Sequence, residues 1–325
     1  MKVFHVKMKE KVQDIINIIP EKPGIYKMLD TKGNIIYIGK SKCLKKRVKS
    51  YFVKSHKWEK INKLVQLIDT IEYIVTDTHL EARLLECQLI KEIKPYFNSQ
   101  MKQDKRYIYL NILDYNQYNS LGISLERRDS SYGPYRSKSM VENLINELKN
   151  FYPISKTHGQ YEFEYHIFPV TMDKETFDSN KLVLEDIIQN SDSLVCFKEE
   201  FERKMALAAA ELRFETAGKY RDIISSLGYI SYGLEGYKSL KKEKIVVTIP
   251  MEEGYKLFYV HNGFILNKKV YKRITKSSRE SFIHQSERIT MDYPYGEDEK
   301  AEKDFIDIVY SEILSLPEDM VHIYS

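Results

Sequence analysis

Alternating and helical patterns of apolar positions over the first hundred residues predict a small α/β domain. In chain order, we expect strands over 24–29 and 35–39, helices over 41–52 and 58–69, a strand over 71–75 and a helix over 78–94. Thr78 and Glu81 form a capping box at the start of the last helix, and Pro95 ends it. The domain is therefore predicted to span residues 1–100.

The rest of the chain is predicted to form three further parts. We expect an intermediate region over 101–195, a helical hairpin over 196–230 and a C-terminal α+β segment over 240–325. The intermediate region holds a predicted strand over 107–113, a turn over 132–135 and an amphipathic helix over 139–151, whereas residues 156–195 are weakly patterned.

The hairpin is predicted from apolar residues at helical spacing on both sides of a break near 214–216. In the C-terminal segment, Asn262-Gly263 is typical of a type I′ turn between strands. A final helix over 298–315 precedes a short strand. These patterns indicate a multidomain α/β (α+β) protein, whose first domain is a small antiparallel sheet flanked by helices.

Composition narrows the class of protein. The chain has 325 residues, 42% hydrophobic and 30% charged, which is usual for a globular protein with a sizeable core. No run reaches the roughly 18 apolar residues of a membrane span, and the first residues lack a signal-peptide core. Three widely spaced cysteines suggest neither a disulfide framework nor a zinc cluster. We therefore expect a cytoplasmic protein without a membrane partner.

Charge is distributed unevenly along the sequence. The net charge is +4, but residues 1–60 hold 16 Lys or Arg and 5 Asp or Glu, which places +11 there. A basic first domain on an otherwise acidic chain is the pattern expected for a polyanionic ligand such as nucleic acid. A solvated lysine-rich surface explains the charge equally well.

The first hairpin carries candidate chemistry. If its loop has an even number of residues, Tyr26 and Tyr37 project from the same face of the sheet. Gly39 lets another group approach that face closely. A helix that begins around Lys40 places Lys40 and Arg47 on one stripe. The alternative is ordinary aromatic packing, which is the more common role of tyrosines in strands.

The helix over 78–94 adds a carboxylate. Glu86 falls inside the apolar arc of this helix, where a carboxylate is costly unless it is paired or bound to a metal. Asn98 follows after Pro95. With a hard cation on Glu86 and Arg47 on the phosphate, the set could cleave a phosphodiester. A tyrosine acting as base would need its pKa lowered by about three units, roughly 4 kcal/mol, by Lys40, Arg47 or the cation.

These residues occur in the order of a known signature. Gly24-Ile25-Tyr26, Tyr37-Ile38-Gly39-Lys40, Arg47, Glu86 and Asn98 resemble the GIY-YIG nuclease superfamily, and most closely its UvrC branch, the nuclease subunit of bacterial nucleotide excision repair. The supporting stretches are Pro23-Gly-Ile-Tyr, Glu81-Ala-Arg-Leu-Leu-Glu, Pro95-Tyr-Phe-Asn and Tyr132-Gly-Pro-Tyr.

The resemblance implies a role for each residue. Glu86 would hold one Mg²⁺ or Mn²⁺, and Tyr26 and Tyr37 would line the catalytic face, one of them as general base. Lys40, Arg47 and Asn98 would support them. The lysine-rich stretch after the hairpin would grip the DNA backbone through Lys42, Lys45, Lys46 and Lys49. The implied reaction is incision of damaged double-stranded DNA on the 3′ side of a lesion.

The sequence from Met205 to Ile224 resembles the UVR motif, a helical hairpin through which UvrC binds UvrB. The residues expected to contact this partner are Leu212, Phe214, Glu215, Ala217, Tyr220, Arg221 and Asp222. The apolar members would form the docking edge and the charged members its rim. The alternative is an internal hairpin packed on its own protein.

The sequence also departs from UvrC. Residues 156–196 contain only Cys196, so no iron–sulfur cluster is expected. The RNase-H-like and helix-hairpin-helix modules of UvrC have no counterpart, so we expect a shortened homologue that makes a single cut, as Cho does, although Cho lacks the UVR hairpin. Two alternatives remain: a non-cutting accessory protein that binds UvrB or DNA, and a structure-specific nuclease independent of UvrB.

Overall fold

The computed structural model describes residues 10–53, 59–99, 101, 107–289 and 299–324. The chain forms two compact units. The first combines Met1–Asp104 with Leu240–Ser325, and the second is Lys105–Ser239. The predicted first domain and the C-terminal segment therefore belong to one unit. Most of the predicted intermediate region and the whole predicted hairpin belong to the other.

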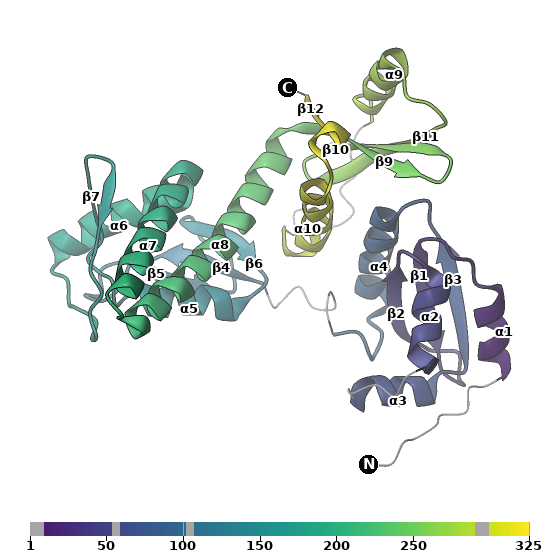
Figure 1. Cartoon of the computed structure of the whole chain (residues 1–325), viewed down its shortest axis with the longest axis horizontal. Helices are drawn as coiled ribbons and strands as arrows, with labels where there is room; N and C mark the ends of the chain where they lie inside the picture. Colours follow the sequence, from purple (N-terminus) through teal and green to yellow (C-terminus); the bar gives the residue numbers. More distant parts are fainter. Residues whose placement is uncertain (1–9, 54–58, 100, 102–106, 290–298, 325) are drawn as a thin grey trace. The chain divides into compact units, whose positions relative to one another are not determined.

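A three-stranded antiparallel sheet forms the centre of the first domain (Figure 1). It consists of β1 (Gly24–Leu29), β2 (Ile35–Ser41) and β3 (Thr70–Val75), with β1 in the middle and β2 at an edge. Tyr26 lies opposite Gly39 and Met28 lies opposite Tyr37. Because directly opposed residues share a face, both tyrosines project from the same side, as predicted.

Helices cover both faces of this sheet. The elements are α1 (Glu10–Ile18), α2 (Leu44–Val53) and α3 (Glu59–Leu67) on one face, and α4 (His79–Ile93) on the other (Figure 1). Tyr26 and Met28 join a buried cluster with residues of α1, α2 and α3. Ile25 and Ile38 are also fully buried, on the α4 side, because side chains alternate along a strand. The sequence patterns did not predict α1.

The boundaries of the helices confirm most predictions and correct one. Thr78 and Glu81 form both hydrogen bonds of the capping box of α4. The helix predicted to begin around Lys40 begins instead at Leu44, and Lys40 lies on β2. The backbone N–H of Cys43 donates to the Ser41 hydroxyl at 2.9 Å, which turns the chain between strand and helix. Residue 58 of the predicted 58–69 helix lies outside the described residues.

The C-terminal segment is a four-stranded antiparallel sheet with helices. Its strands are β9 (Lys244–Met251), β10 (Gly254–His261), β11 (Phe264–Tyr271) and β12 (Val321–Tyr324), in the order β11-β10-β9-β12. Its helices are α9 (Lys276–Ser286), α10 (Glu299–Ser315) and a short 3-10 turn, Glu318–Met320. Positive φ angles at Asn262 and Gly263 confirm the predicted tight turn between β10 and β11. Residue 298 of the predicted last helix lies outside the described residues.

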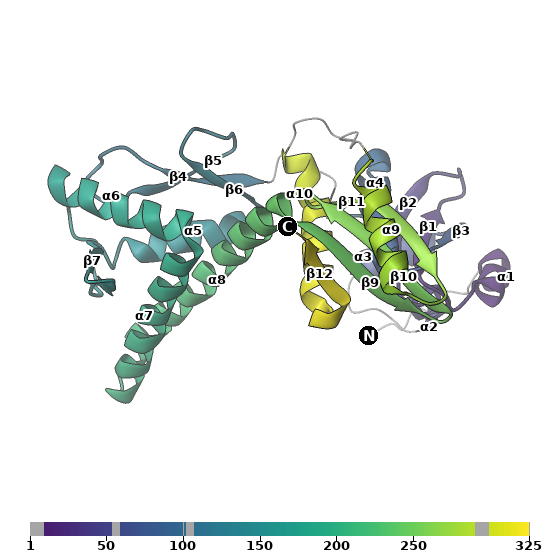
Figure 2. The same ribbon diagram turned by 90° about the horizontal axis from the view of Figure 1, so that it is seen from above.

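The two faces of this sheet have different neighbours. Leu257 and Tyr259 of β10 pack with Phe282 of α9, which lies along the sheet in Figure 2. Lys256, which projects from the opposite face, is buried and donates to Asp77 and Glu81 at the start of α4. The C-terminal segment therefore packs against the first domain through the helix that carries Glu86.

Ion pairs hold α4 on the side away from its sheet. Lys91 and Asp304 of α10 are 3.0 Å apart, and their side chains are only 7% and 2% exposed. Arg83 donates to Glu312 of α10 at 2.8 Å. Removing one member of a buried pair leaves an uncompensated charge and typically costs about 3–5 kcal/mol. The position of α4 thus depends on residues more than two hundred positions later in the sequence.

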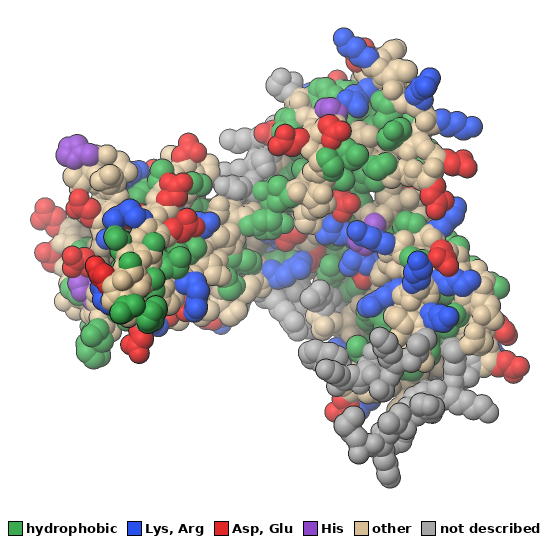
Figure 3. All heavy atoms as spheres, viewed as in Figure 1, with side chains coloured by type: hydrophobic (Ala, Val, Ile, Leu, Met, Phe, Trp, Pro, Cys, Tyr) green, Lys and Arg blue, Asp and Glu red, His purple; other side chains and the backbone are tan. Residues whose placement is uncertain are grey.

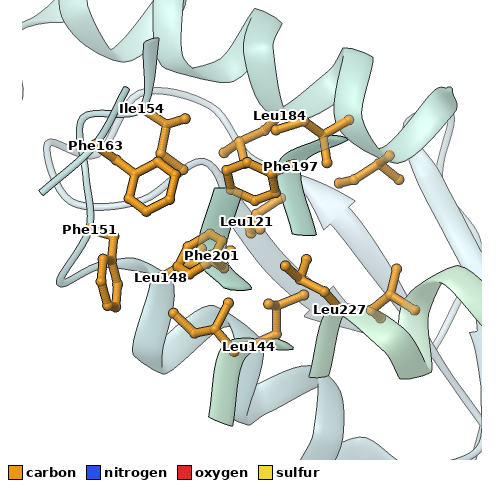
Figure 4. Close-up of a cluster of buried hydrophobic side chains, with 14 of the residues drawn as sticks. Leu121, Leu144, Leu148, Phe151, Ile154, Phe163, Leu184, Phe197, Phe201 and Leu227 are labelled. Carbon is orange, nitrogen blue, oxygen red and sulfur yellow. The ribbon is translucent and has the colours of Figure 1, made fainter. Parts of the chain in front are cut away.

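The second unit has its own core. Its strands are β4 (Ile108–Ile112), β5 (Leu121–Ser124), β6 (Ser131–Tyr135), β7 (Ser155–Thr157) and β8 (Gln160–Glu162), and its helices are α5 (Lys138–Leu148), α6 (Lys174–Gln189), α7 (Ser191–Ala210) and α8 (Phe214–Lys242). Figure 4 shows the side chains that fill it, among them Phe151, Phe163, Phe197 and Phe201. The rings of Phe163 and Phe201 are stacked with centroids 4.3 Å apart.

The structure differs from the sequence analysis at three places in this unit. Residues 132–135 are not a turn but part of β6, which pairs with β4. The weakly patterned region contains α6, whose buried residues include Phe177, Leu184 and Ile188. The break between the hairpin helices falls at residues 211–213, slightly before the predicted position. In the part of the chain that the structure describes, no helix has both the length and the apolar character needed to cross a membrane.

Candidate active site

A pocket of about 410 Å³ lies along strand β2 in the first unit. All six residues predicted to act in catalysis or metal binding line it: Tyr26, Tyr37, Lys40, Arg47, Glu86 and Asn98. They come from β1, β2, α2, α4 and the segment after α4. The structure therefore brings together residues spread over more than seventy positions of the sequence.

The edge position of β2 explains why two polar side chains point inward. An edge strand leaves backbone groups without a neighbouring strand. The Asn98 side-chain amide forms hydrogen bonds with both backbone groups of Ile38. Its oxygen accepts from the Ile38 N–H at 2.9 Å, and its nitrogen donates to the Ile38 carbonyl at 2.8 Å. The Glu86 carboxylate accepts from the N–H of Lys40 at 3.0 Å. Asn98 and Glu86 thus complete the strand edge as well as lining the pocket.

Glu86 also forms an ion pair inside the pocket. Its second carboxylate oxygen accepts from the Lys40 ammonium at 2.7 Å, and the residue is 8% exposed. A glutamate paired with a lysine was the alternative to metal binding, and the structure contains that pair. Lys40 also fixes the carboxylate in one orientation.

The pocket suits a cation that needs few protein ligands because it keeps most of its bound waters. Among the described residues, no group of three or more His, Cys, Asp or Glu side chains is arranged to hold a metal. Mg²⁺ usually keeps several waters and binds through one or two carboxylates together with substrate phosphates. The single buried carboxylate of Glu86, facing a polar pocket, fits this mode of binding.

A third tyrosine, Tyr51, is buried beside the pocket and contacts the two tyrosines that line it. The hydroxyl of Tyr51 lies 2.9 Å from that of Tyr26 and donates to that of Tyr37 at 3.5 Å. Arg47 donates to the same Tyr51 hydroxyl at 3.3 Å. The sequence analysis did not single out Tyr51. Its position one helical turn after Arg47 was the available signal, because residues four apart share a helix face.

Gly39 permits this arrangement. It lies opposite Tyr26, and a Cβ atom at position 39 would collide with the Tyr26 hydroxyl and ring. Only glycine leaves room for the Tyr26 ring to lie over β2. The second glycine of the motif therefore sets the position of the tyrosine in the first strand.

The protein environment does not activate the tyrosines. Burial raises the pKa of Tyr26, and the neighbouring phenols of Tyr51 and Tyr37 raise it further, while Arg47 lowers it by less. Burial also raises the pKa of Tyr37, followed by Tyr51 and the nearby Glu86 charge. We expected Lys40, Arg47 or a bound cation to lower the pKa of a tyrosine. For the protein groups alone, without the cation, this expectation is wrong, because the pKa of both tyrosines is raised.

His79 is a further titratable residue in the pocket that the sequence analysis missed. It is the first residue of α4 and lies two turns before Glu86 on the same helix face. Burial lowers its pKa, Glu312 opposes this, and Lys42 and Arg83 lower it further. Its imidazole is therefore neutral at pH 7.

The four predicted DNA-binding lysines differ in their contacts. Lys45 donates to the backbone carbonyl of Asn17 at 3.1 Å, and Lys46 lies 3.7 Å from Glu21. Lys42 and Lys49 are exposed and form no ion pair with the residues that the structure describes. These two ammonium groups are the most available for a phosphate.

The predicted partner-binding residues fall into two groups. Leu212 and Phe214, at the turn between α7 and α8, are 74% and 66% exposed. Glu215, Arg221 and Asp222 are also exposed, and Arg221 pairs with Asp222 at 2.8 Å. Tyr220 is instead buried against Phe151 and Phe201, and Ala217 packs on the same core. The last two residues therefore stabilise the second unit itself.

Comparisons with known proteins agree with the geometry. Residues 22–99 match the UvrC-like GIY-YIG domain family. UvrABC system protein C of Caldanaerobacter subterraneus subsp. tengcongensis is 32% identical over 294 residues, which are 84% of this chain and 48% of that protein. The protein of the same name from Desulfitobacterium hafniense is 28% identical over 336 residues, 96% of this chain and 50% of that protein. The chain thus spans about half the length of the curated relatives it matches.

A solved structure is similar over the first domain. The GIY-YIG N-terminal endonuclease domain of UvrC from Thermotoga maritima, bound to its catalytic divalent cation magnesium, is 39% identical. The match covers 28% of this chain and 100% of that one, with a TM-score of 0.26.

The fold and the residues around β2 define the first domain as a GIY-YIG domain. Within that superfamily it belongs to the UvrC branch, and the similarity to UvrABC system protein C proteins extends well beyond it.

Proposed function

We propose that this protein is a cation-dependent endonuclease that makes one incision in damaged duplex DNA, on the 3′ side of the lesion, after recruitment by UvrB. The observation that carries the proposal is the convergence of Glu86, Arg47 and the tyrosines on one pocket at the edge of β2. Three facts support the choice of DNA repair: the UvrC-like domain, the relatives named UvrABC system protein C and the basic first domain.

Each pocket residue has a distinct task in this proposal. A bound Mg²⁺ or Mn²⁺ would stabilise the negative charge that develops on the phosphate and leaving oxygen. Glu86 would hold that cation, and Arg47 would bind the phosphate through its planar guanidinium. Tyr37 is the tyrosine that water can reach, because it is partly exposed whereas Tyr26 is only 1% exposed. Tyr37 would take the proton of the attacking water as the bond from phosphorus to the leaving oxygen breaks, and that oxygen would then take a proton from solvent.

Lys40 and Asn98 would act through other groups. Lys40 orients the Glu86 carboxylate by the 2.7 Å ion pair. Asn98 holds the edge of β2 by two hydrogen bonds to Ile38, adjacent to Tyr37. Tyr51 bridges the other two phenols and Arg47, so it fixes the geometry of the trio.

The test of the proposed function is incision of an end-labelled duplex that carries one defined lesion. With UvrB, ATP and Mg²⁺, we expect a single labelled product whose end maps to the 3′ side of the lesion. Cutting without UvrB would favour a structure-specific nuclease instead. Binding of UvrB or DNA without any cutting would favour an accessory protein.

The incision rate is expected to rise with pH. Because burial raises the pKa of Tyr37, only a small fraction of this base is deprotonated at neutral pH. The single-turnover rate should therefore increase about tenfold per pH unit between about pH 7 and 9. Single-turnover incision measured across this range checks it. A rate that levels off below pH 7 and disappears in His79→Ala would assign the base to His79, whose pKa is lowered.

We further propose that the α7–α8 hairpin binds UvrB through its tip, which extends away from the rest of the second unit in Figure 2. Leu212 has a φ of +61°, a backbone conformation that branched residues rarely adopt. The Arg213 N–H donates to Ala208 at 2.8 Å, as in helix ends that usually use glycine. An exposed leucine at such a position, next to exposed Phe214, favours a docking role over an internal one.

Phe214→Ala should weaken UvrB binding at least tenfold, because an exposed aromatic at the centre of a small interface contributes most of its energy. The measurement is titration of UvrB by surface plasmon resonance. Leu182→Ala is the matched control, since Leu182 is an equally exposed apolar residue, 66%, on α6. Unchanged binding by Phe214→Ala would exclude this hairpin tip as the docking site.

A further inference from the structure

The C-terminal segment contains a basic stretch that the active site does not use. From Gly254 to Arg279 the sequence has seven Lys or Arg residues and no Asp or Glu. Four of them are Lys269, at the end of β11, Lys272 and Arg273, after the strand, and Lys276, the first residue of α9. We name these four residues the β11–α9 basic segment. It is a local concentration of positive charge in a C-terminal segment, 240–325, whose other residues include 9 Lys or Arg and 15 Asp or Glu.

The side chains of the β11–α9 basic segment are exposed and unneutralised. All four are exposed, and none forms an ion pair with the residues that the structure describes. Figure 3 shows Lys and Arg side chains gathered over α9 and the connection that leads to it from β11. Other lysines of the same unit are paired: Lys256 with Asp77 and Glu81, Lys244 with Glu287 and Lys303 with Asp307. The positive charge of the β11–α9 basic segment is therefore available to an external anion.

Edge protection explains only one of these four residues, and helix stability explains none of them. Lysines on an edge strand prevent pairing with other chains, which accounts for Lys269 on β11. Lys272, Arg273 and Lys276 lie beyond the strand. Lys276 stands at the positive end of the α9 dipole, and the first turn has no acidic residue. A cation there costs about 0.3–1 kcal/mol, so α9 itself would be more stable without it.

The basic segment lies in the same unit as the candidate active site. Lys268, which precedes it on β11, pairs with Glu81 in the first turn of α4. Glu81 and Glu86 are on that one helix, about 7.5 Å apart along its axis. From Lys268, β11 continues to Tyr271, about 10 Å further. A duplex held at the active site carries a negative charge every 1.7 Å or so of its length.

We propose that the β11–α9 basic segment is a second contact with the DNA backbone, which binds phosphates of the duplex that flanks the cut site. This inference rests on the proposed function, since DNA as substrate comes from it. The contact is electrostatic and independent of base sequence, because exposed lysines bind phosphates without reading bases. It would position the duplex while Arg47 and Glu86 act on one phosphate.

The test compares two charge-matched triple variants of the full chain in a Glu86→Gln background. One is Lys272→Gln, Arg273→Gln and Lys276→Gln. The control, Lys32→Gln, Lys138→Gln and Lys174→Gln, removes three exposed lysines from scattered positions. Fluorescence anisotropy with a duplex of about 30 base pairs, without divalent cation, gives the dissociation constant between about 50 and 200 mM salt. Circular dichroism checks that both variants fold.

The basic-segment variant should bind about tenfold more weakly, and the slope of log affinity against log salt should fall by about two to three, since each lost phosphate contact contributes about 0.9. The control should keep the slope of the parent. An unchanged slope, or an equal loss in the control, overturns the proposal. This titration measures binding and not cleavage. If the protein binds DNA through this segment but the wild type never cuts, only the proposed function is contradicted.

Discussion

Glu86→Gln should reduce the incision rate by about a thousandfold or more. Glutamine keeps the shape of the side chain and still accepts from the Lys40 N–H, a hydrogen bond of 3.0 Å in the wild type. It removes the buried negative charge that would hold the cation. Loss of about 4 kcal/mol of transition-state stabilisation, a modest share of what a metal ion supplies, corresponds to three orders of magnitude. The measurement is the single-turnover rate on a lesion-bearing duplex.

A second readout separates metal binding from folding. Calorimetric titration with Mn²⁺ should show binding by the wild type and none by Glu86→Gln. The Lys40 side chain is 33% exposed, so water can solvate its ammonium after the partner charge is lost, and circular dichroism should still show a folded chain. Glu92→Gln is the matched control, because Glu92 is an exposed glutamate on the same helix and accepts from Gln88 at 2.9 Å. Equal cation affinity in the wild type and Glu86→Gln would exclude Glu86 as the ligand.

Arg47→Lys should slow incision about 10²–10³-fold, although the charge is conserved. The guanidinium donates to Tyr51 at 3.3 Å and its carbon lies 5.1 Å from the centre of the Tyr51 ring. An ammonium cannot both bind a phosphate through two parallel donors and keep the contact with Tyr51. The scissile phosphate and the three tyrosines are then no longer held by one side chain. The effect should appear in kcat more than in KM, as checked by steady-state incision at several DNA concentrations.

Arg203→Lys provides the control for this conservative change. Arg203 is exposed on α7 and pairs with Glu200 at 2.7 Å, in the second unit. Its replacement should leave the incision rate within about twofold of the wild type, as is usual for surface positions away from a site. If Arg47→Lys behaves like Arg203→Lys, the guanidinium does not bind the scissile phosphate.

The local geometry of the first domain could be predicted because it depends on short-range rules. Strand alternation predicted that Tyr26 and Tyr37 share one face if the loop has an even number of residues, and the register of β1 and β2 meets this condition. A helical wheel identified Glu86 as an inward carboxylate, and it is 8% exposed. The role of Asn98 at the strand edge was not predictable, because the sequence does not show that β2 lies at an edge.

The remaining features depend on contacts that are distant in sequence. Lys256 reaches Glu81 across 175 positions, and Arg83 reaches Glu312 across 229. No periodicity in either segment indicates the other. The pKa of Tyr37 likewise depends on how many neighbours bury the phenol, so the sequence could raise the question of its activation but not the direction of the shift. The sequence analysis did not identify α6, although its buried residues Phe177, Leu184 and Ile188 stand at helical spacing.

The most direct test of the central claim is one denaturing gel of a lesion-bearing duplex labelled at one end, incubated with UvrB, ATP and Mg²⁺. The lanes are wild type, Glu86→Gln and Glu92→Gln. We predict one product, cut on the 3′ side of the lesion, for the wild type and Glu92→Gln, and none for Glu86→Gln. Equal cutting in all three lanes, or none with the wild type, would contradict the assignment of the β2 pocket as a nuclease site.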